Sequence, residues 1–485
     1  MRFFLGIVII GVVSGVSLSA SKEAPKPAPS SGPKATETTP SKVIPHVRQK
    51  PDFCGEACVE MVLRRLGSKL TQDEVFALSG LDPSLGRGCY TADLNRALDR
   101  LGFRVGTVFH RVAVKKADEE LRALWAGVRR DLDRGVPSIV CTRFDKSPNT
   151  TEHFRLVVGF DPKSSEVIYH DPAFDKGANR RMKLTDFFEL WPLKYERDRW
   201  TVIRFALDAP DQAKLKKATA EIRREWHSPA DFAQHVMKLK KRLGKRFTVL
   251  VEKPFVVIGD QSPSEVKRWS KRTVRWATDR LKELYFDRDP REILDVYLFR
   301  DKKSYRYHTK KFFNDNPGTP YGYYSPTHKA LIMDISTGGG TLVHEIVHPF
   351  VEANFPRCPS WFNEGLGSLY EQSGERGGRI RGLVNWRLRG LQNAIRAGTV
   401  PSFQTLTATT TREFYDEDPG SNYGQARYLC YYLQEKGLLT KYYKRFVARR
   451  EKDPTGYQTL KEVLGVKDMK AFQKKWEAFV LKLRF

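Results

Sequence analysis

The stretch IPHVRQKPDFCGEACVEMVLRRLG, residues 44–67, predicts how the first folded region of this chain begins. Its apolar side chains repeat near the helical period at Ala57, Met61, Leu63 and Leu66. Gly67 ends the run, so we expect a helix that starts near Gly55 and stops there. Cys54 immediately precedes this helix, where the positive end of the helix dipole favours a thiolate. The sequence therefore places a candidate nucleophile at a helix N-terminus.

A hairpin pattern follows in the segment EHFRLVVGFDPKSSEVIYHDPAF. Its turn is expected near Pro162 and Lys163, and a pairing centred there sets His153 opposite Asp171. An imidazole oriented by a carboxylate is the base that a cysteine nucleophile needs. Because helical patterns come first and strand patterns last, residues 44–206 are predicted to form an α+β domain.

These two segments resemble the papain-like family of bacterial leader and bacteriocin-processing peptidases. The resemblance rests on Gln followed by Cys-Gly-x-Ala-Cys, then His-Phe-x-x-Val-x-Gly and Asp-Pro, over residues 44–191. It implies that Cys54 is the nucleophile, His153 the base and Asp171 the acid that orients the base. It also implies that Gln49 completes an oxyanion hole with the backbone N–H of Cys54. The spacing between Gln49 and Cys54 is one residue shorter than in many members of the family.

Alternatives stay open for the cysteines of this region. Cys58, one helical turn beyond Cys54, is either a buried small residue or a disulfide partner that would block the nucleophile. The six cysteines are too few for a disulfide scaffold, but export would permit one or two disulfides, such as one involving Cys89 and Cys141. A further alternative is that the domain keeps its fold only to bind peptides.

A second folded region is predicted over residues 247–485. It opens with the strand-like segments FTVLVEKPFVVIGD, LDVYLF and KALIMDIS, and from Thr341 onward it reads almost wholly helical. Between the first two of these segments, Ser262 and Glu265 form the pattern of a capping box at the start of a helix. This region is also predicted to be α+β, with a mostly helical C-terminal part.

The segment GGGTLVHEIVHPF, which starts at Gly338, carries two histidines four residues apart. On a helix His344 and His348 project from one face and can bind one metal ion. Glu345 then stands beside the metal-bound water, where a general base is needed. Downstream, PSWFNEGLGSLYE supplies Glu364 as a third ligand and leaves a fourth position open, as catalytic zinc requires.

HEIVH followed by WFNEGLGSLYE resembles the gluzincin metallopeptidases, over residues 247–475. The resemblance implies that zinc is the cofactor, with His344, His348 and Glu364 as its ligands. It also implies that Glu345 is the base and proton shuttle. Glu371 is a competing third ligand, because the gap between the second histidine and the family's glutamate is a few residues shorter here than in the best-known members.

Gluzincins also use a downstream Tyr or His to stabilise the oxyanion. In the segment SNYGQARYLCYYLQEKG the nearest match is Tyr423. The same predicted helix carries three other candidates, which are Tyr428, Tyr431 and Tyr432. The sequence alone does not choose among these four tyrosines.

The chain ends and linkers have their own patterns. Residues 1–19 read as a secretory signal peptide, with an uncleaved membrane anchor as the alternative, and no other stretch is apolar enough to cross a bilayer. Residues 20–43 read as a Pro-, Ser- and Lys-rich tether that is expected to be disordered, and residues 207–246 as a basic helical connector. We therefore expect a secreted, periplasmic or cell-envelope protein.

The charge of the chain favours anionic partners. It has 84 Lys and Arg against 57 Asp and Glu, a formal net charge of +27. Cell-envelope polymers, lipid headgroups and acidic proteins all fit such a surface, and no specific nucleic-acid partner is expected of an exported chain. Together the patterns predict an exported bacterial peptidase that acts on peptides or proteins. A surface-binding scaffold with one or both sites inert, or a cell-wall stem-peptide hydrolase, is the alternative.

Overall fold

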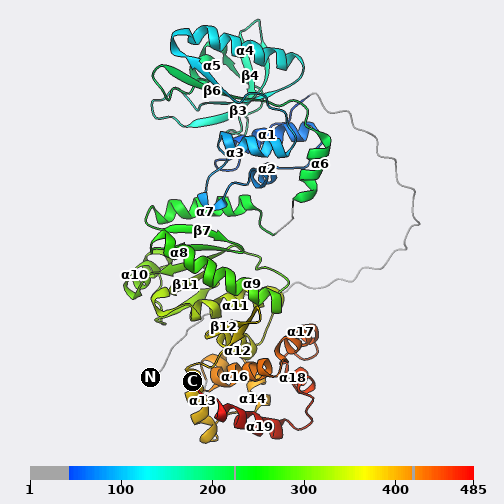
Figure 1. Cartoon of the computed structure of the whole chain (residues 1–485), viewed down its shortest axis with the longest axis vertical. Coiled ribbons are helices and arrows are strands. Elements are labelled where there is room, and N and C mark those ends of the chain that lie inside the picture. Colours follow the sequence, from blue (N-terminus) through cyan, green and yellow to red (C-terminus); the bar gives the residue numbers. More distant parts are fainter. Residues whose placement is uncertain (1–42, 223–225, 418–420) are drawn as a thin grey trace, which may run out of the picture. The chain divides into compact units, whose positions relative to one another are not determined.

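The computed structural model describes residues 43–222, 226–417 and 421–485. The predicted signal peptide and nearly all of the predicted tether lie outside these residues. The chain divides into two compact units with a boundary between Arg242 and Leu243 (Figure 1). Within the described ranges, no helix has the length and apolar character needed to span a membrane.

The first unit is built on a six-stranded antiparallel sheet with the order β1-β6-β2-β3-β4-β5. Its strands are β1 (Phe109–Ala113), β2 (Ser138–Arg143), β3 (Glu152–Asp161), β4 (Glu166–His170), β5 (Arg180–Lys183) and β6 (Arg199–Ala206). Its helices are α1 (Cys54–Arg65), α2 (Gln72–Ser79), α3 (Thr91–Arg100), α4 (Ala117–Asp133), α5 (Leu184–Leu190), α6 (Gln212–Glu221) and α7 (Pro229–Leu243), with short 3₁₀ turns at Pro83–Leu85 and Val114–Lys116.

The sheet of this unit is buried on both faces. Alternate residues of β2 point to opposite sides, so Ile139 and Cys141 join a core with α1 to α3, while Val140 joins a second core with α4 and α5. Helices therefore cover both faces of the sheet, and the α+β prediction for this unit is confirmed.

The segment 207–246, predicted as a connector, is helical over α6 and α7. The small side chains of Ala218, Ala230 and Ala233 lie in the same core as α1. Gln234 in α7 also donates a hydrogen bond of 2.8 Å to the carbonyl of Pro51, just before α1. Both helices thus pack on the first unit.

The second unit has a five-stranded mixed sheet with the order β10-β11-β9-β8-β7 and a two-stranded hairpin. Its strands are β7 (Thr248–Glu252), β8 (Phe255–Gly259), β9 (Leu294–Phe299), β10 (Gly322–Ser325), β11 (Ala330–Asp334), β12 (Ser373–Arg376) and β13 (Arg379–Gly382). Its first helices are α8 (Pro263–Trp269), the π-helical turn η3 (Ser270–Arg275), α9 (Trp276–Leu284), α10 (Lys302–Phe313), the 3₁₀ turn η4 (Ile335–Thr337), α11 (Gly340–Asn354) and α12 (Ser360–Tyr370). The remaining helices are α13 (Arg387–Arg396), α14 (Phe403–Ala408), α15 (Thr411–Tyr415), α16 (Asn422–Glu435), α17 (Leu439–Arg449), α18 (Tyr457–Leu464) and α19 (Met469–Lys482).

The chain after Thr341 is mostly helical, as predicted, but the hairpin β12–β13 interrupts it. Gly377 and Gly378 form its two-residue turn with φ angles of 59° and 75°. Two successive positive φ angles match the twist of paired strands and are easily adopted by glycine, which is why this short polar segment folds as a hairpin. The predicted capping box is present, since Ser262 and Glu265 bond each other's backbone N–H groups.

Candidate active sites

The thiol site forms where the start of α1 meets β3. Cys54 is the first residue of α1 and is half-buried. A backbone hydrogen bond from Phe154, the residue after His153, reaches its sulfur. In the described parts of the chain, no side-chain hydrogen bond joins Cys54 to His153. The backbone contact with Phe154 is what brings Cys54 next to His153.

His153 and Asp171 form a buried pair. The Nε2 atom of His153 lies 2.8 Å from Oδ1 of Asp171. The other carboxylate oxygen accepts a hydrogen bond of 3.0 Å from Nε of Arg155, and the backbone N–H of Ala173 donates to Oδ1 at 3.0 Å. Asp171 is therefore held from three directions, which fixes the plane of the imidazole.

The predicted hairpin is present, but its register is not the one expected. Leu156 pairs with His170, so continuing the ladder sets Asp171 beside Arg155 rather than opposite His153. The difference arises at the turn, because Asp161 pairs with Glu166 and the four residues between them are centred beyond Pro162 and Lys163. An extra residue in β3, between Val157 and Gly159, then shifts the register back by one position. The contact with His153 is therefore diagonal, and the same carboxylate bridges the histidine and the arginine.

The charge states of the pair follow from burial and hydrogen bonding. Burial alone would raise the pKa of Asp171, but the hydrogen bond from His153 and the charges of His153 and Arg155 lower it to about 2. Burial lowers the pKa of His153, and the carboxylate only partly offsets this. Asp171 is thus ionised at neutral pH and accepts a hydrogen bond from the Nε2–H group, which leaves Nδ1 of a neutral His153 free to accept a proton.

Burial of Cys54 opposes the effect that the helix dipole has on its thiol. Burial raises the pKa of Cys54 to about 12 and outweighs the lowering effect of the backbone hydrogen bond from Phe154. The negative charges of Glu56 and Asp52 raise it further. The cysteine is therefore a neutral thiol at neutral pH.

This charge state predicts how Cys54 reacts with iodoacetamide. Because only the thiolate is alkylated, the rate should rise about tenfold per pH unit between about pH 7 and about pH 10. The measurement is the fraction of Cys54 modified over time, read by mass spectrometry, with buried Cys430 as the internal control. A rate that levels off below about pH 8 would instead indicate a thiolate paired with a protonated histidine.

The other residues predicted near this site are also placed. Gln49 lies beside the segment that follows Asp171, since its backbone N–H donates a hydrogen bond of 2.9 Å to the carbonyl of Pro172. Its side-chain oxygen is buried and has no hydrogen-bond partner among the described residues. Cys58 is buried with its Sγ 3.8 Å from the carbonyl of Phe154. All six cysteines are free, so neither the disulfide with Cys54 nor any disulfide of Cys89 and Cys141 is present.

The candidate metal site lies between α11 and α12. His344 and His348 are one turn apart on α11, with ring centroids 4.8 Å apart. Glu364 on α12 reaches both, with its carboxylate oxygens 3.1 Å from Nε2 of His344 and 3.8 Å from Nε2 of His348. Glu345 completes the group, and an oxygen of its carboxylate is 3.9 Å from Nε2 of His348. Donor atoms of His344, Glu345 and His348 lie within 4.8 Å of one another.

The Nδ1 atom of each histidine faces an oxygen atom. Nδ1 of His348 is 3.0 Å from Oδ1 of Asn363, and Nδ1 of His344 is 3.2 Å from an oxygen of Glu371. Arg387 in turn binds Glu371 through two hydrogen bonds of 2.8 and 3.0 Å. Glu371, the competing third ligand, therefore lies on the side of the His344 ring that faces away from Glu364.

The glycine-rich approach to α11 has a steric reason. A Cβ atom on Gly340 would stand 2.2 Å from the carbonyl oxygen of Glu371. Only a residue without a side chain lets the start of α11 approach the end of α12 this closely. The same contact brings Glu371 within reach of His344.

The four candidate tyrosines have different surroundings in the structure. Tyr423 stands near the site, with its ring 6.1 Å from that of Tyr415. Tyr428 hydrogen-bonds the backbone of Asn385, and the rings of Tyr431 and Tyr432 pack against Phe479. These last three tyrosines serve packing.

Tyr415 is a site residue that the sequence did not reveal. Its hydroxyl donates a hydrogen bond of 2.5 Å to Oε1 of Glu364. The contact spans 51 residues, and no motif marks the segment that carries it. Burial would raise the pKa of Glu364, but the two histidines and Tyr415 hold it at about 2, so this carboxylate is ionised.

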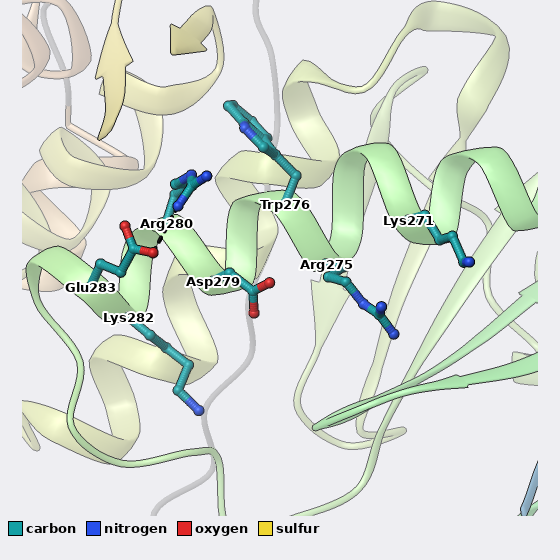
Figure 2. A pocket seen from close by; sticks show the side chains of 7 residues that line it. All are labelled: Lys271, Arg275, Trp276, Asp279, Arg280, Lys282 and Glu283. Atoms are coloured by element: carbon teal, nitrogen blue, oxygen red, sulfur yellow. Dashed lines mark hydrogen bonds and ion pairs between the residues drawn. The ribbon is translucent and has the colours of Figure 1, made fainter. Parts of the chain in front are cut away.

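A surface hollow of about 460 Å³ lies beside η3 and α9 (Figure 2). Seven residues line it, namely Lys271, Arg275, Trp276, Asp279, Arg280, Lys282 and Glu283. None of them belongs to either site, and most of its cations are already paired: Arg275 with Glu252, Arg280 with Glu283, and Lys282 with Asp289. We read it as a solvated helix surface.

Comparison with known proteins covers the first unit. Residues 41–201 match the model of the Peptidase_C39 like family, which supports the predicted papain-like peptidase domain. A solved structure of the peptidase domain of Streptococcus ComA, described as a bifunctional ABC transporter involved in a quorum-sensing pathway, is 17% identical. That match covers 33% of this chain and 97% of the domain, with a TM-score of 0.22. No curated protein matches the chain. The family match ends at residue 201, so the gluzincin resemblance of the second unit stays a prediction.

Proposed function

We propose that the first unit is a cysteine peptidase in which Cys54, His153 and Asp171 act together. The observation that carries this proposal is the buried hydrogen bond of 2.8 Å between His153 and Asp171, formed next to Cys54. It leaves Nδ1 of His153 as a proton acceptor on the side of the ring away from Asp171. The match of residues 41–201 to a peptidase family supports the same function.

The reaction follows from these charge states. As the sulfur of Cys54 attacks the peptide carbonyl, its proton passes to Nδ1 of His153, and Asp171 stabilises the imidazolium that forms. The backbone N–H of Cys54, together with the Gln49 amide, is proposed to bind the developing oxyanion. His153 then gives the proton to the leaving amine, and water hydrolyses the thioester that remains on Cys54.

The thioester provides the test. Full-length protein mixed with a peptide substrate and quenched in acid should carry the acyl group on the tryptic peptide that contains Cys54. The His153→Ala variant should accumulate none, because attack lacks its base. Hydrolysis without any acylated Cys54, under conditions where chelator has no effect, would contradict the proposal.

A second catalytic site is favoured by the donor set between α11 and α12. Two imidazole Nε2 atoms and an ionised carboxylate converge. Nδ1 of His348 contacts Asn363, and Nδ1 of His344 lies 3.2 Å from Glu371. Nitrogen and carboxylate donors in this number fit zinc, and the outer partners are those that orient zinc-binding histidines. We propose that His344, His348 and Glu364 would hold zinc. When bound, zinc lowers the pKa of water and polarises the substrate carbonyl.

The residues around this donor set have roles of their own. Glu345 is proposed to accept the proton of the attacking water and pass it to the leaving amine. The backbone N–H of Tyr324 donates to its carboxylate at 3.1 Å and holds it toward the donor set. Tyr423 is proposed to stabilise the oxyanion, and Tyr415 to orient Glu364.

The hydrogen bond from Tyr415 makes a testable prediction. Tyr415→Phe removes the hydroxyl that orients Glu364, and should weaken zinc affinity about 10-fold. Tyr432→Phe is the matched control, because its ring packs against Phe479 and it should leave the affinity unchanged. The zinc affinity of both variants is measured by competition with a zinc-binding dye. Equal affinities would mean that Tyr415 has no role in zinc binding.

The substrates and location are proposed from the sequence. A signal peptide at residues 1–19 would export the chain, so peptides or proteins of the cell envelope or its surroundings are the proposed substrates. Fractionation of cells producing the tagged full chain tests this directly. Recovery of the protein in the cytoplasm with an intact N-terminus would contradict export.

A further inference from the structure

Helix α10 covers one face of the second unit's sheet. The ring of Phe313 packs 5.1 Å from that of Tyr297 in β9. The neighbouring residues of β9, Val296 and Leu298, point to the other face and join the core that contains α11. The sheet therefore lies between α10 and the candidate metal site.

The outer face of α10 carries only cations and one exposed tyrosine, Tyr307. Lys245 and Arg246 extend this face, because the next residue, Phe247, packs its ring 5.0 Å from His308 and 5.6 Å from Phe312. We define the α10 basic patch by these exposed residues: Lys245, Arg246, Lys302, Lys303, Arg306, Lys310 and Lys311. Nowhere in residues 43–222, 226–417 or 421–485 does any of them meet an acidic partner within ion-pair distance.

The spacing of these cations is that of a helix with two distinct faces. Lys303, Arg306 and Lys310 recur every three or four residues, and Tyr305, Thr309 and Phe313 form the opposite, buried face. Other basic helices of the unit pair some of their charges; Arg445 and Arg449 of α17, for example, bind Glu462. The α10 basic patch keeps all of its positive charge available to a partner.

We propose that the α10 basic patch docks the protein on an anionic membrane surface by binding lipid phosphate groups. A convex helix face presents its charges in a plane and encloses nothing, which suits a surface of many phosphates better than a single small ligand. The exposed ring of Tyr307, with Lys311 5.7 Å from its centroid, has the amphipathic character of side chains at the headgroup level. Each Lys or Arg near such a surface raises binding about fivefold, an effect that salt weakens.

The test is cosedimentation of the full chain with vesicles of phosphatidylcholine, with or without phosphatidylglycerol. We expect binding only when phosphatidylglycerol is present. The patch variant Lys303→Glu, Arg306→Glu, Lys310→Glu and Lys311→Glu should lower the partition coefficient about 100-fold or more. The matched control reverses four exposed lysines in and just before α19, with the same change in net charge: Lys467→Glu, Lys470→Glu, Lys474→Glu and Lys475→Glu.

Each outcome decides the proposal. Loss in the patch variant alone supports it, provided that near-UV circular dichroism shows the same fold in both variants; if the patch variant is misfolded, Lys310→Gln with Lys311→Gln gives the same comparison. Equal loss in both variants would mean that net charge alone drives binding and would overturn it. So would binding of the wild type to soluble polyphosphate but not to vesicles, which would point to an envelope polymer. The proposal does not depend on either peptidase site.

Discussion

The Cys54→Ala variant is expected to lose thiol-dependent peptide hydrolysis by about 10⁴-fold or more, since no other group can form the thioester. The measurement is cleavage of an unstructured peptide with a metal chelator present, so that zinc-dependent cleavage does not contribute. The structure predicts no change in folding, because Cys54 is half-buried and alanine removes only its sulfur.

Cys58→Ala is the matched control for this effect. Cys58 is buried one turn further along α1, where it packs in the apolar core and its sulfur lies 3.8 Å from the carbonyl oxygen of Phe154. The control should keep nearly full activity. If Cys58→Ala abolished cleavage and Cys54→Ala did not, the nucleophile would have been assigned to the wrong residue.

The second large effect is on metal binding. Glu364→Ala is expected to reduce bound zinc from about one ion per chain to a small fraction, because the two remaining histidine ligands bind zinc weakly on their own. The measurement is elemental analysis of purified protein after dialysis against a trace of zinc. Burial of Glu364 means that the variant must also be checked for an unchanged circular dichroism spectrum.

Variants of two further glutamates serve as comparisons for the zinc content of Glu364→Ala. Glu352→Ala changes an exposed residue of the same helix α11 and should leave the zinc content unchanged. Glu371→Ala should retain zinc with weaker affinity, because Glu371 contacts Nδ1 of His344 rather than the side that faces Glu364. Full loss of zinc in Glu371→Ala, with retention in Glu364→Ala, would exchange the roles of the two residues.

The local features of both sites could be predicted from the sequence because they depend on residues close together in the chain. The helix after Cys54 and the pairing of His344 with His348 on one face follow from helical spacing. The hairpin of β3 and β4 follows from two strand patterns around a polar turn.

Features that depend on packing could not be predicted in this way. The extra residue near Val158 shifts the β3–β4 register, and it brings Arg155 to Asp171. Burial of Cys54 raises its pKa against the helix dipole, and burial is set by elements distant in sequence. Tyr415 reaches Glu364 only because α15 folds back onto α12. Patterns among neighbouring residues in the sequence do not predict such long-range contacts.

We propose that one chain carries two independent peptidase sites. The most direct test compares peptide cleavage by the wild type, Cys54→Ala, Glu345→Gln and the double variant, each with and without chelator. We expect that Cys54→Ala keeps only chelator-sensitive cleavage, that Glu345→Gln keeps only chelator-resistant cleavage, and that the double variant cleaves nothing. Cleavage by the double variant at the wild-type rate would contradict this proposal.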